Sequence, residues 1–180
     1  MTNNLRQTTS FALTDELRRV VTNISDEYSE TDLTTTLEKS HSILVTLFGD
    51  GVENHFVMNS GDTEISLPLF PILEVQRVKK NNIDTQDFTV EDRRGIVTLT
   101  GNIEDKDRIK IKYVPSIFRD IELLLAKRQF ILEHNIVASS SESEANIENI
   151  NFELNNMIKR VRNNVQRLYG VPSLFPVKSQ

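Results

Sequence analysis

The spacing of hydrophobic residues changes twice along the chain, and these changes constrain the fold more than any other feature. Before Val52, apolar residues recur every three or four positions, as on one face of a helix. From Val52 the spacing falls to two, which is typical of half-buried strands, and after Pro115 the helical spacing returns. Strands joined by short turns pair antiparallel, because a parallel pair needs a long crossover. The sequence therefore predicts an α+β fold, with helices on both sides of an inserted small antiparallel β-sheet or partial barrel.

Six segments of the insert have the composition and turn-forming boundaries of short strands. The predicted strands are His55–Met58, Glu64–Leu67, Ile72–Lys79, Asp87–Val90, Gly95–Thr100 and Arg108–Val114. Pro68 and Pro71 are expected outside the ladders, because proline has no N–H to donate. The last strand alternates strictly between apolar residues and lysines, which are Ile109, Ile111 and Tyr113 against Lys110 and Lys112. We expect the first set to be buried and the lysines to face solvent.

Three helices are predicted around this insert. Thr14 begins a short first helix that ends near Ser25, and a second helix runs from residues 29–31 to Gly49. Ser116 begins a third helix, whose predicted apolar side comprises Ile117, Phe118, Ile121, Leu124, Leu125, Ile131 and Leu132. This breadth of apolar surface indicates that the third helix is the centre of the core.

The C-terminal region is predicted as a linker, an amphipathic helix and an extended arm. Residues 137–145 are small and polar, so we expect a solvated linker between a helical core at 1–136, with its sheet at about 52–115, and the region 146–180. In the helix, apolar residues recur at alternating spacings of three and four; they are Ile147, Ile150, Leu154, Met157, Val161 and Leu168, with Ile158 and Val165 widening the stripe. Gly170 is expected to end the helix, and a tail with two prolines and apolar residues between them follows.

The net charge of −5 is unevenly distributed. Residues 1–156 contain all 26 acidic and 16 basic residues, a net charge of −10, whereas residues 157–180 contain five basic residues and no acidic residue. A cationic segment on an acidic body attracts either nucleic acid or an acidic protein surface, although it can also be only the solvated face of a helix.

The order of these segments resembles the head-tail connector proteins (adaptor or head-completion proteins) of tailed bacteriophages and related viruses. The residues that carry the resemblance are Leu67-Pro68-Leu69, Val75 to Lys79, Asp87-Phe88-Thr89-Val90, Gly95 to Leu99, Ile109 to Val114 and the helix from Ile117. The resemblance covers about the middle 40% of the chain. It implies an α+β subunit in which the helices form a bundle that carries the small inserted sheet. It also implies a structural virion protein that forms a homo-oligomeric, commonly dodecameric, ring beneath the portal at the capsid vertex. The ring would link the portal to the tail or neck protein, with DNA in its lumen but no sequence-specific DNA binding.

The resemblance also implies which residues meet the partners. In that family the C-terminal segment typically reaches the portal protein, and the matching docking arm here contains Lys159, Arg160, Arg162, Arg167, Tyr169, Val171, Leu174 and Phe175. Two charged turns are candidates for contacts with the tail or with neighbouring subunits, and their residues are Arg93, Arg94, Glu104, Asp105 and Asp107. The expected location is the neck of the virion, and the host cytoplasm during assembly.

The sequence predicts no enzyme, cofactor or metal site. It has no cysteine, no glycine-rich phosphate loop and no nucleophile elbow. His41 lies on the apolar stripe of the second helix with no second ligand at metal spacing, so we expect a partly buried packing residue. No apolar run is long enough for a membrane span, and the polar N-terminus does not predict a signal peptide. The alternatives that stay open are a nucleic-acid-binding module that uses the basic arm and a non-viral interaction domain.

Overall fold

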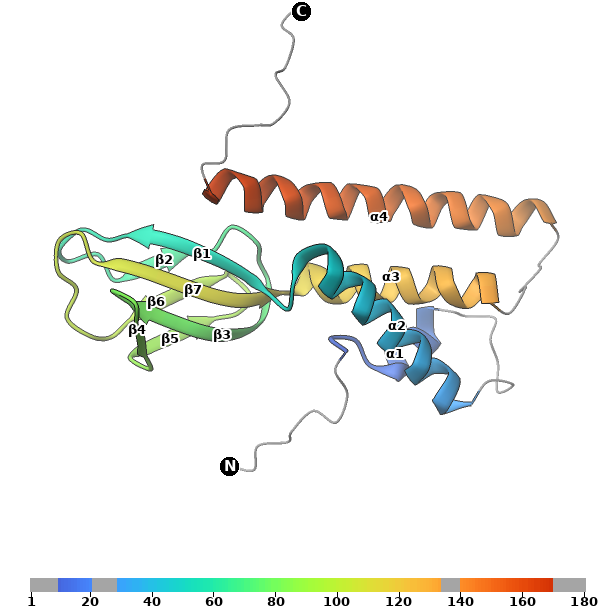
Figure 1. The fold of residues 1–180 in the computed structure, drawn as a ribbon, viewed down its shortest axis with the longest axis horizontal. Coiled ribbons are helices and arrows are strands. Elements are labelled where there is room, and N and C mark those ends of the chain that lie inside the picture. Colours follow the sequence, from blue (N-terminus) through green and yellow to red (C-terminus); the bar gives the residue numbers. More distant parts are fainter. Residues whose placement is uncertain (1–9, 21–28, 134–139, 170–180) are drawn as a thin grey trace, which may run out of the picture. The chain divides into compact units, whose positions relative to one another are not determined.

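Helices and strands occur in the order of a helical segment, a strand-rich insert and a second helical segment in the computed structural model (Figure 1). The structure describes residues 10–20, 29–133 and 140–169, with side chains of the last helix described at 146–164. The chain divides into a helix unit (Met1–Asp50 and Ser116–Met157) and a strand unit (Gly51–Pro115 and Ile158–Gln180). The predicted mixed α+β class is confirmed.

The first two helices begin with their predicted signals. Helix α1 is Thr14–Val20, and the predicted end near Ser25 lies outside the described residues. Helix α2 is Glu30–Phe48, and it begins with a capping box in which the Ser29 hydroxyl accepts a hydrogen bond from Asp32 N (3.2 Å) and Asp32 Oδ2 accepts one from Ser29 N (3.1 Å). Gly49 ends α2 at φ 78°, a conformation that glycine adopts without steric cost.

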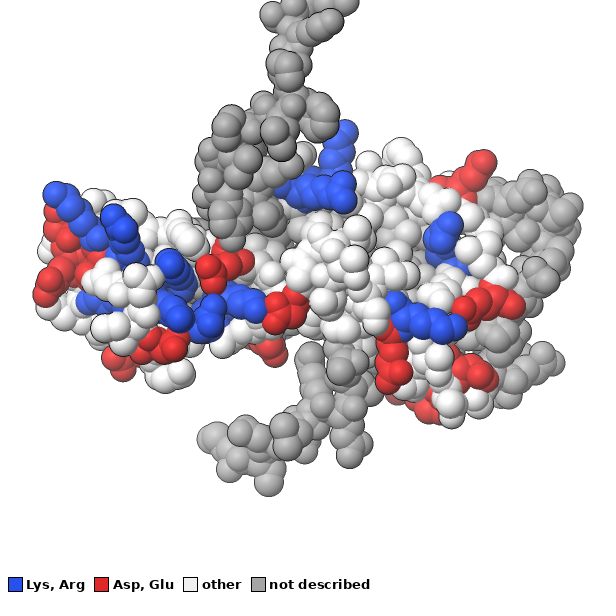
Figure 2. Space-filling view, viewed as in Figure 1, with Lys and Arg blue, Asp and Glu red and all other residues white. Residues whose placement is uncertain are grey.

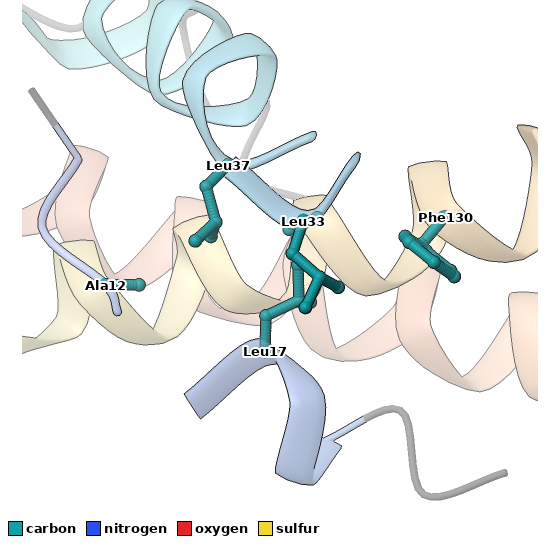
Figure 3. Close-up of a cluster of buried hydrophobic side chains, with 6 residues drawn as sticks. Ala12, Leu17, Leu33, Leu37 and Phe130 are labelled. Atoms are coloured by element: carbon teal, nitrogen blue, oxygen red, sulfur yellow. The ribbon is translucent and has the colours of Figure 1, made fainter. Parts of the chain in front are cut away.

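A buried cluster joins α1 and α2 to helix α3, Ser116–Glu133. Its members are Ala12, Leu17, Leu33, Leu37, Ala126 and Phe130, and Figure 3 shows Leu17 and Leu33 meeting between the helices. On α3, fully buried residues recur every four positions. They are Phe118, Glu122, Ala126 and Phe130, and Ile121 beside them is also fully buried.

Part of the predicted apolar side of α3 is wrong. Leu132 is 48% exposed, and Leu124, Leu125 and Ile131 are only partly buried. The reason is that α1 and α2 pack against the row that contains Phe118 and Phe130, so the leucines fall to either side of the buried face. Helix α3 is central to the core, as predicted, but the most buried face of α3 is not the predicted one.

The strands form two antiparallel sheets. Sheet A has the order β1 (Val52–Val57), β7 (Arg108–Pro115), β3 (Ile72–Lys80) and β4 (Ile83–Thr85). Sheet B has the order β2 (Glu64–Ser66), β6 (Ile96–Leu99) and β5 (Phe88–Glu91). Among the described residues there are thus seven strands, one more than predicted, because the short β4 was missed. Pro68 and Pro71 lie outside the strands, as expected.

Strand β7 is central in sheet A, and its predicted faces are confirmed. Ile109, Ile111 and Tyr113 are completely buried. The Tyr113 hydroxyl accepts a hydrogen bond from Leu69 N (3.4 Å) and donates one to Asn54 Oδ1 (3.2 Å), while burial raises the pKa of Tyr113 to about 12. The imperfect alternation in β3 reflects two register shifts against β7, because each irregularity turns the following side chains to the other face.

Helix α4, Ser140–Tyr169, begins earlier than predicted. Residues 140–145 have helical backbone, so the predicted linker at 137–145 is wrong over that part, and residues 137–139 lie outside the described residues. The segment contains no glycine or proline that would oppose a helix. Ile150, Leu154 and Val161 of the predicted stripe are buried, and Arg128 Nε of α3 donates a hydrogen bond to Asn151 Oδ1 of α4 (2.9 Å).

Candidate functional site

The basic residues predicted for the docking arm begin on an exposed face of α4. Lys159, Arg160 and Arg162 are exposed, whereas Val161 between them is buried. The Arg160 carbonyl accepts a hydrogen bond from Asn164 Nδ2 (2.9 Å) one turn later. The three cations are thus available to a partner without exposing the apolar stripe, which is already covered.

The remaining residues of the predicted arm lie at the end of α4 or after it in the sequence. Arg167 and Tyr169 lie on helical backbone, and their side chains are not described. Val171, Leu174 and Phe175 lie outside the described residues. The predicted extended docking tail therefore stays a prediction.

The candidate turn at Glu104–Asp107 contains one residue that is structural. Asp107 is 5% exposed, and its carboxylate accepts hydrogen bonds from Glu104 N (2.7 Å) and Asn81 Nδ2 (2.7 Å) while Lys80 Nζ lies 2.8 Å from Oδ2. These donors, with Lys80 as the largest influence, lower the pKa of Asp107 to about 2. Asp107 joins the loop before β7 to the turn after β3, and its predicted contact with another protein stays a prediction.

Glu104 and Asp105 remain exposed at this turn, in contrast to Asp107. Hydrogen bonds between Met58 and the turn, Met58 N to Asp107 O (2.9 Å) and Lys106 N to Met58 O (2.8 Å), hold the loop against the end of β1. The backbone of the turn is therefore fixed, and only the first two acidic side chains are presented to solvent.

The other candidate turn, at Arg93 and Arg94, lies at the opposite end of the strand unit. It connects β5 to β6, and Arg94 pairs with Glu91 at 3.2 Å. Asp92 O accepts a hydrogen bond from Ile72 N (3.0 Å), and Ile72 is paired with Pro115 at the end of β7. Asp107 instead lies just before the first residue of β7. The eight residues of β7 therefore separate Asp107 from Pro115 by roughly 25 Å. The structure does not bring the two predicted turns together.

A row of cations on the outward face of sheet A was not predicted as a site. The register places Arg77 opposite Lys112 and Lys79 opposite Lys110, with Arg108 next along β7. Figure 2 shows Lys and Arg atoms following one another across the strand unit. We call this set of five residues the basic face. It concentrates positive charge in a region of the chain whose net charge is negative.

Acidic residues border the basic face and partly neutralise it. Glu53 on β1 lies 3.3 Å from Arg77 and 2.9 Å from His55, and the hydrogen bond from His55 is the largest of the influences that lower its pKa. Asp84 on β4 lies 4.0 Å from Lys79. Within the described residues, Arg108 and Lys110 have no ion-pair partner. Arg108 is exposed and Lys110 is partly buried, so the charges of these two β7 residues are not neutralised by an ion pair within the described residues.

The sequence feature that could have indicated the basic face is the alternation of cations in two strands. Arg77 and Lys79 alternate in one strand, and Arg108, Lys110 and Lys112 alternate in another. Only the pairing of β3 with β7 shows that both sets lie on the same face, and pairing between distant strands cannot be deduced from alternation alone.

A buried carboxylate in the helix unit was also missed. Glu122 is completely buried, accepts a hydrogen bond from Ala12 N (2.6 Å) and lies 2.8 Å from His41 Nδ1. The ring of Phe11 meets the His41 ring edge-on at 4.9 Å between centroids. His41 is partly buried, as predicted, and it also contacts a buried carboxyl group. The available signal was the position of Glu122 four residues after Phe118 and four before Ala126, within the buried row of α3.

A small cavity lies in the helix unit. It has a volume of 120 Å³ and is lined by Ser10, Ala12, Leu13, Thr14, Glu30, Thr34 and Leu37. Its one carboxylate, Glu30, is paired with Arg18 at 2.8 Å. No group of three or more His, Asp or Glu residues in the described ranges is arranged to hold a metal ion.

None of the described helices is both long enough and apolar enough to cross a membrane. Comparison of the sequence with models of protein families and with curated proteins finds no match.

Proposed function

We propose that this protein is a structural connector of a tailed virus, which forms a ring beneath the portal and links the capsid vertex to the tail. In this proposal α1, α2, α3 and α4 form a helical bundle, and the strand unit is the insert that meets neighbouring subunits or the next tail component. The protein would lie in the virion neck, and in the host cytoplasm during assembly. It would act by binding, without catalysis or a cofactor.

The observation that carries the proposal is the position of the strand-rich insert. Residues 51–115 of the strand unit leave the helix unit after α2 and return to it directly where β7 ends at Pro115 and α3 begins at Ser116. The segments that resemble head-tail connectors coincide with β3, β5, β6, β7 and the first turns of α3. This observation supports the arrangement of helices and strands along the chain, and the portal and tail partners are tested by the experiment.

The exposed cations of α4 support the portal as the partner of the C-terminal arm. Lys159, Arg160 and Arg162 lie where the resemblance places the portal-docking segment, and they lead toward the apolar residues of the tail. Positive charge would accelerate the encounter with an acidic portal surface, and burial of Leu174 and Phe175 would prolong the complex.

The same cations favour nucleic-acid binding as a second candidate. Contacts between Lys or Arg and phosphates make affinity fall steeply with salt, roughly in proportion to the number of contacts. A titration of duplex DNA at several salt concentrations distinguishes this candidate, because a connector without a DNA-binding role would show little binding at any of them.

Co-sedimentation with DNA-filled capsids that lack tails tests the connector function directly. We expect the full chain to attach and a chain without residues 171–180 to remain in solution while keeping its circular dichroism spectrum. Electron microscopy of the bound particles should show a ring at one vertex. A folded truncated protein that attaches like the full chain would place the docking surface elsewhere, and absence of the full chain from the vertex would exclude the function.

A further inference from the structure

The basic face places like charges opposite each other across two strands. Like charges directly opposite each other in a sheet are destabilising, and here Lys79 faces Lys110 and Arg77 faces Lys112. On the same face, Val57 of β1 is 67% exposed and lies opposite Arg108. Arg108 and Lys110 have no ion-pair partner among the described residues, and together with the exposed Val57 they suit an acidic partner that also brings an apolar residue.

The same chain contains a surface with this complementary chemistry on α4. Between Arg128 and Lys159 the sequence has five glutamates and no lysine or arginine. The exposed side of the helix within this stretch consists of Glu148, Asn149, Phe152, Glu153, Asn155 and Asn156, which we call the acidic face. Phe152 is 69% exposed between the two glutamates. Its ring is the most exposed aromatic side chain of the described residues.

The two faces also match in length. Residues 148–156 of a helix extend over about 12 Å at 1.5 Å per residue. Residues 108–112 of a strand extend over about 14 Å at 3.4 Å per residue. Glu148 and Glu153 are separated by about 7.5 Å along the helix axis and by about 140° around it, so they would reach Arg108 and Lys110, which are about 7 Å apart along β7, from the two sides of Phe152.

From this complementarity we propose that the basic face of one copy binds the acidic face of α4 of a second copy. Glu148 and Glu153 would pair with Arg108 and Lys110, and Phe152 would pack on Val57. Each copy carries both faces, so the contact is head-to-tail, and such a contact produces a ring where the rotation closes. The inference rests on the proposed function, because it assigns the surfaces through which the ring would form.

A nucleic-acid phosphate backbone is the other polyanion that could occupy the basic face. The observations favour the helix, because a phosphate backbone offers nothing to cover Val57 and the acidic face would otherwise leave Phe152 in solvent. Nucleic-acid binding by the basic face is therefore the alternative that the experiment distinguishes.

Charge reversal of each face separately, followed by mixing, tests the contact. The first variant carries Arg108→Glu and Lys110→Glu, and the second carries Glu148→Lys and Glu153→Lys. Each variant alone would oppose like charges and should associate about tenfold more weakly than wild type, or worse. An equimolar mixture restores opposite charges at every contact of an alternating ring, so association should return.

The first variant is expected to fold, because a glutamate at 110 faces Lys79 and replaces a like-charge pair with an opposite one. Arg19→Glu with Lys127→Glu is the matched control, since it makes the same change of charge in the helix unit. Sedimentation velocity at low and high salt gives the readout, alone and after incubation with tailless capsids. Salt should weaken the wild-type association and leave the control like wild type.

Three results would overturn the inference. They are a wild-type chain that stays a single copy both alone and on capsids, a first variant that assembles like wild type, and a mixture that fails to restore association. Duplex DNA binding that is lost in the first variant while assembly is unchanged would assign the face to nucleic acid instead. If rings form through other residues and attach to capsids, the connector function stands and the contact between the two faces is wrong. If rings form through these faces but never attach to capsids, the contact stands and the connector function is wrong.

Discussion

The carboxylate of Glu122 lies 2.8 Å from Nδ1 of His41 and accepts a hydrogen bond from the backbone of Ala12, so one buried acid connects α3, α2 and the segment before α1. Burial is the largest influence on Glu122 and raises its pKa above the ordinary 4.5, although Ala12 N–H and His41 act in the opposite direction. The pair therefore makes the helix unit sensitive to pH.

The first prediction concerns that sensitivity. A raised carboxyl pKa contributes stability below the unfolded pKa of 4.5, and this contribution is lost as the pH rises through the folded pKa. Glu122→Gln keeps the shape and can still accept from Ala12 N, but it does not titrate. We expect the free energy of unfolding of wild type, relative to this variant, to fall as the pH increases from about 4 to about 8. Urea unfolding across that range provides the measurement.

Glu38→Gln is the control for this experiment, because Glu38 is exposed on α2. Its unfolding free energy should follow that of wild type at each pH. A difference between wild type and Glu122→Gln that does not change with pH would show that Glu122 has the same pKa in the folded and unfolded states.

The second prediction compares two apolar positions of α3. Ile121 is completely buried and Leu132 is 48% exposed. Ile121→Ala should lower the free energy of unfolding by about 2–5 kcal/mol, because it removes buried methyl groups and leaves a cavity. Leu132→Ala should change it by less than about 0.5 kcal/mol. Thermal or urea unfolding of the two variants checks the ranking, and equal losses would contradict the burial of α3 described above.

The third prediction concerns Asp107 and the start of β7. Its pKa is lowered from 3.8 to about 2, so its carboxylate stabilises the fold above pH 3.8 and this stabilisation is lost as the pH falls toward 2. Asp107→Asn should lower the melting temperature at neutral pH, because the amide cannot hold Lys80 and accepts fewer hydrogen bonds. The variant should also lose less stability than wild type on acidification.

Asp105→Asn provides the comparison for Asp107, since Asp105 is an exposed residue of the same turn. Its melting temperature should match wild type at neutral and acidic pH. If both asparagine variants melted alike, the hydrogen bonds of Asp107 to Glu104 N and Asn81 would not contribute measurably to stability.

Local patterns in the sequence predicted the parts of the fold that depend on neighbouring residues. The alternation of Ile109, Ile111 and Tyr113 was sufficient to place the two faces of β7, and Ser29 and Gly49 fixed the ends of α2. Features that depend on long-range pairing were not predictable. The basic face requires the register between β3 and β7, and the role of Asp107 requires its contact with Lys80 and Asn81 across the sheet. The helical backbone at 140–145 shows that a small, polar composition without glycine or proline does not exclude a helix.

The last prediction tests the cations of the C-terminal helix. Arg160 and Arg162 are exposed on α4, and the proposed function assigns them to the portal-docking arm. Arg160→Glu with Arg162→Glu should weaken attachment to tailless, DNA-filled capsids at low salt and have a smaller effect at high salt, because exposed charges are screened beyond a Debye length of about 10 Å at 0.1 M salt. The loss should lie mainly in the association rate, since peripheral charges steer encounter more than they retain the complex. Co-sedimentation at two salt concentrations, with Arg19→Glu plus Lys127→Glu as the control of equal charge change, gives the comparison. If the two double variants lost attachment to the same extent, net charge would be the cause and the docking role of Arg160 and Arg162 would be wrong.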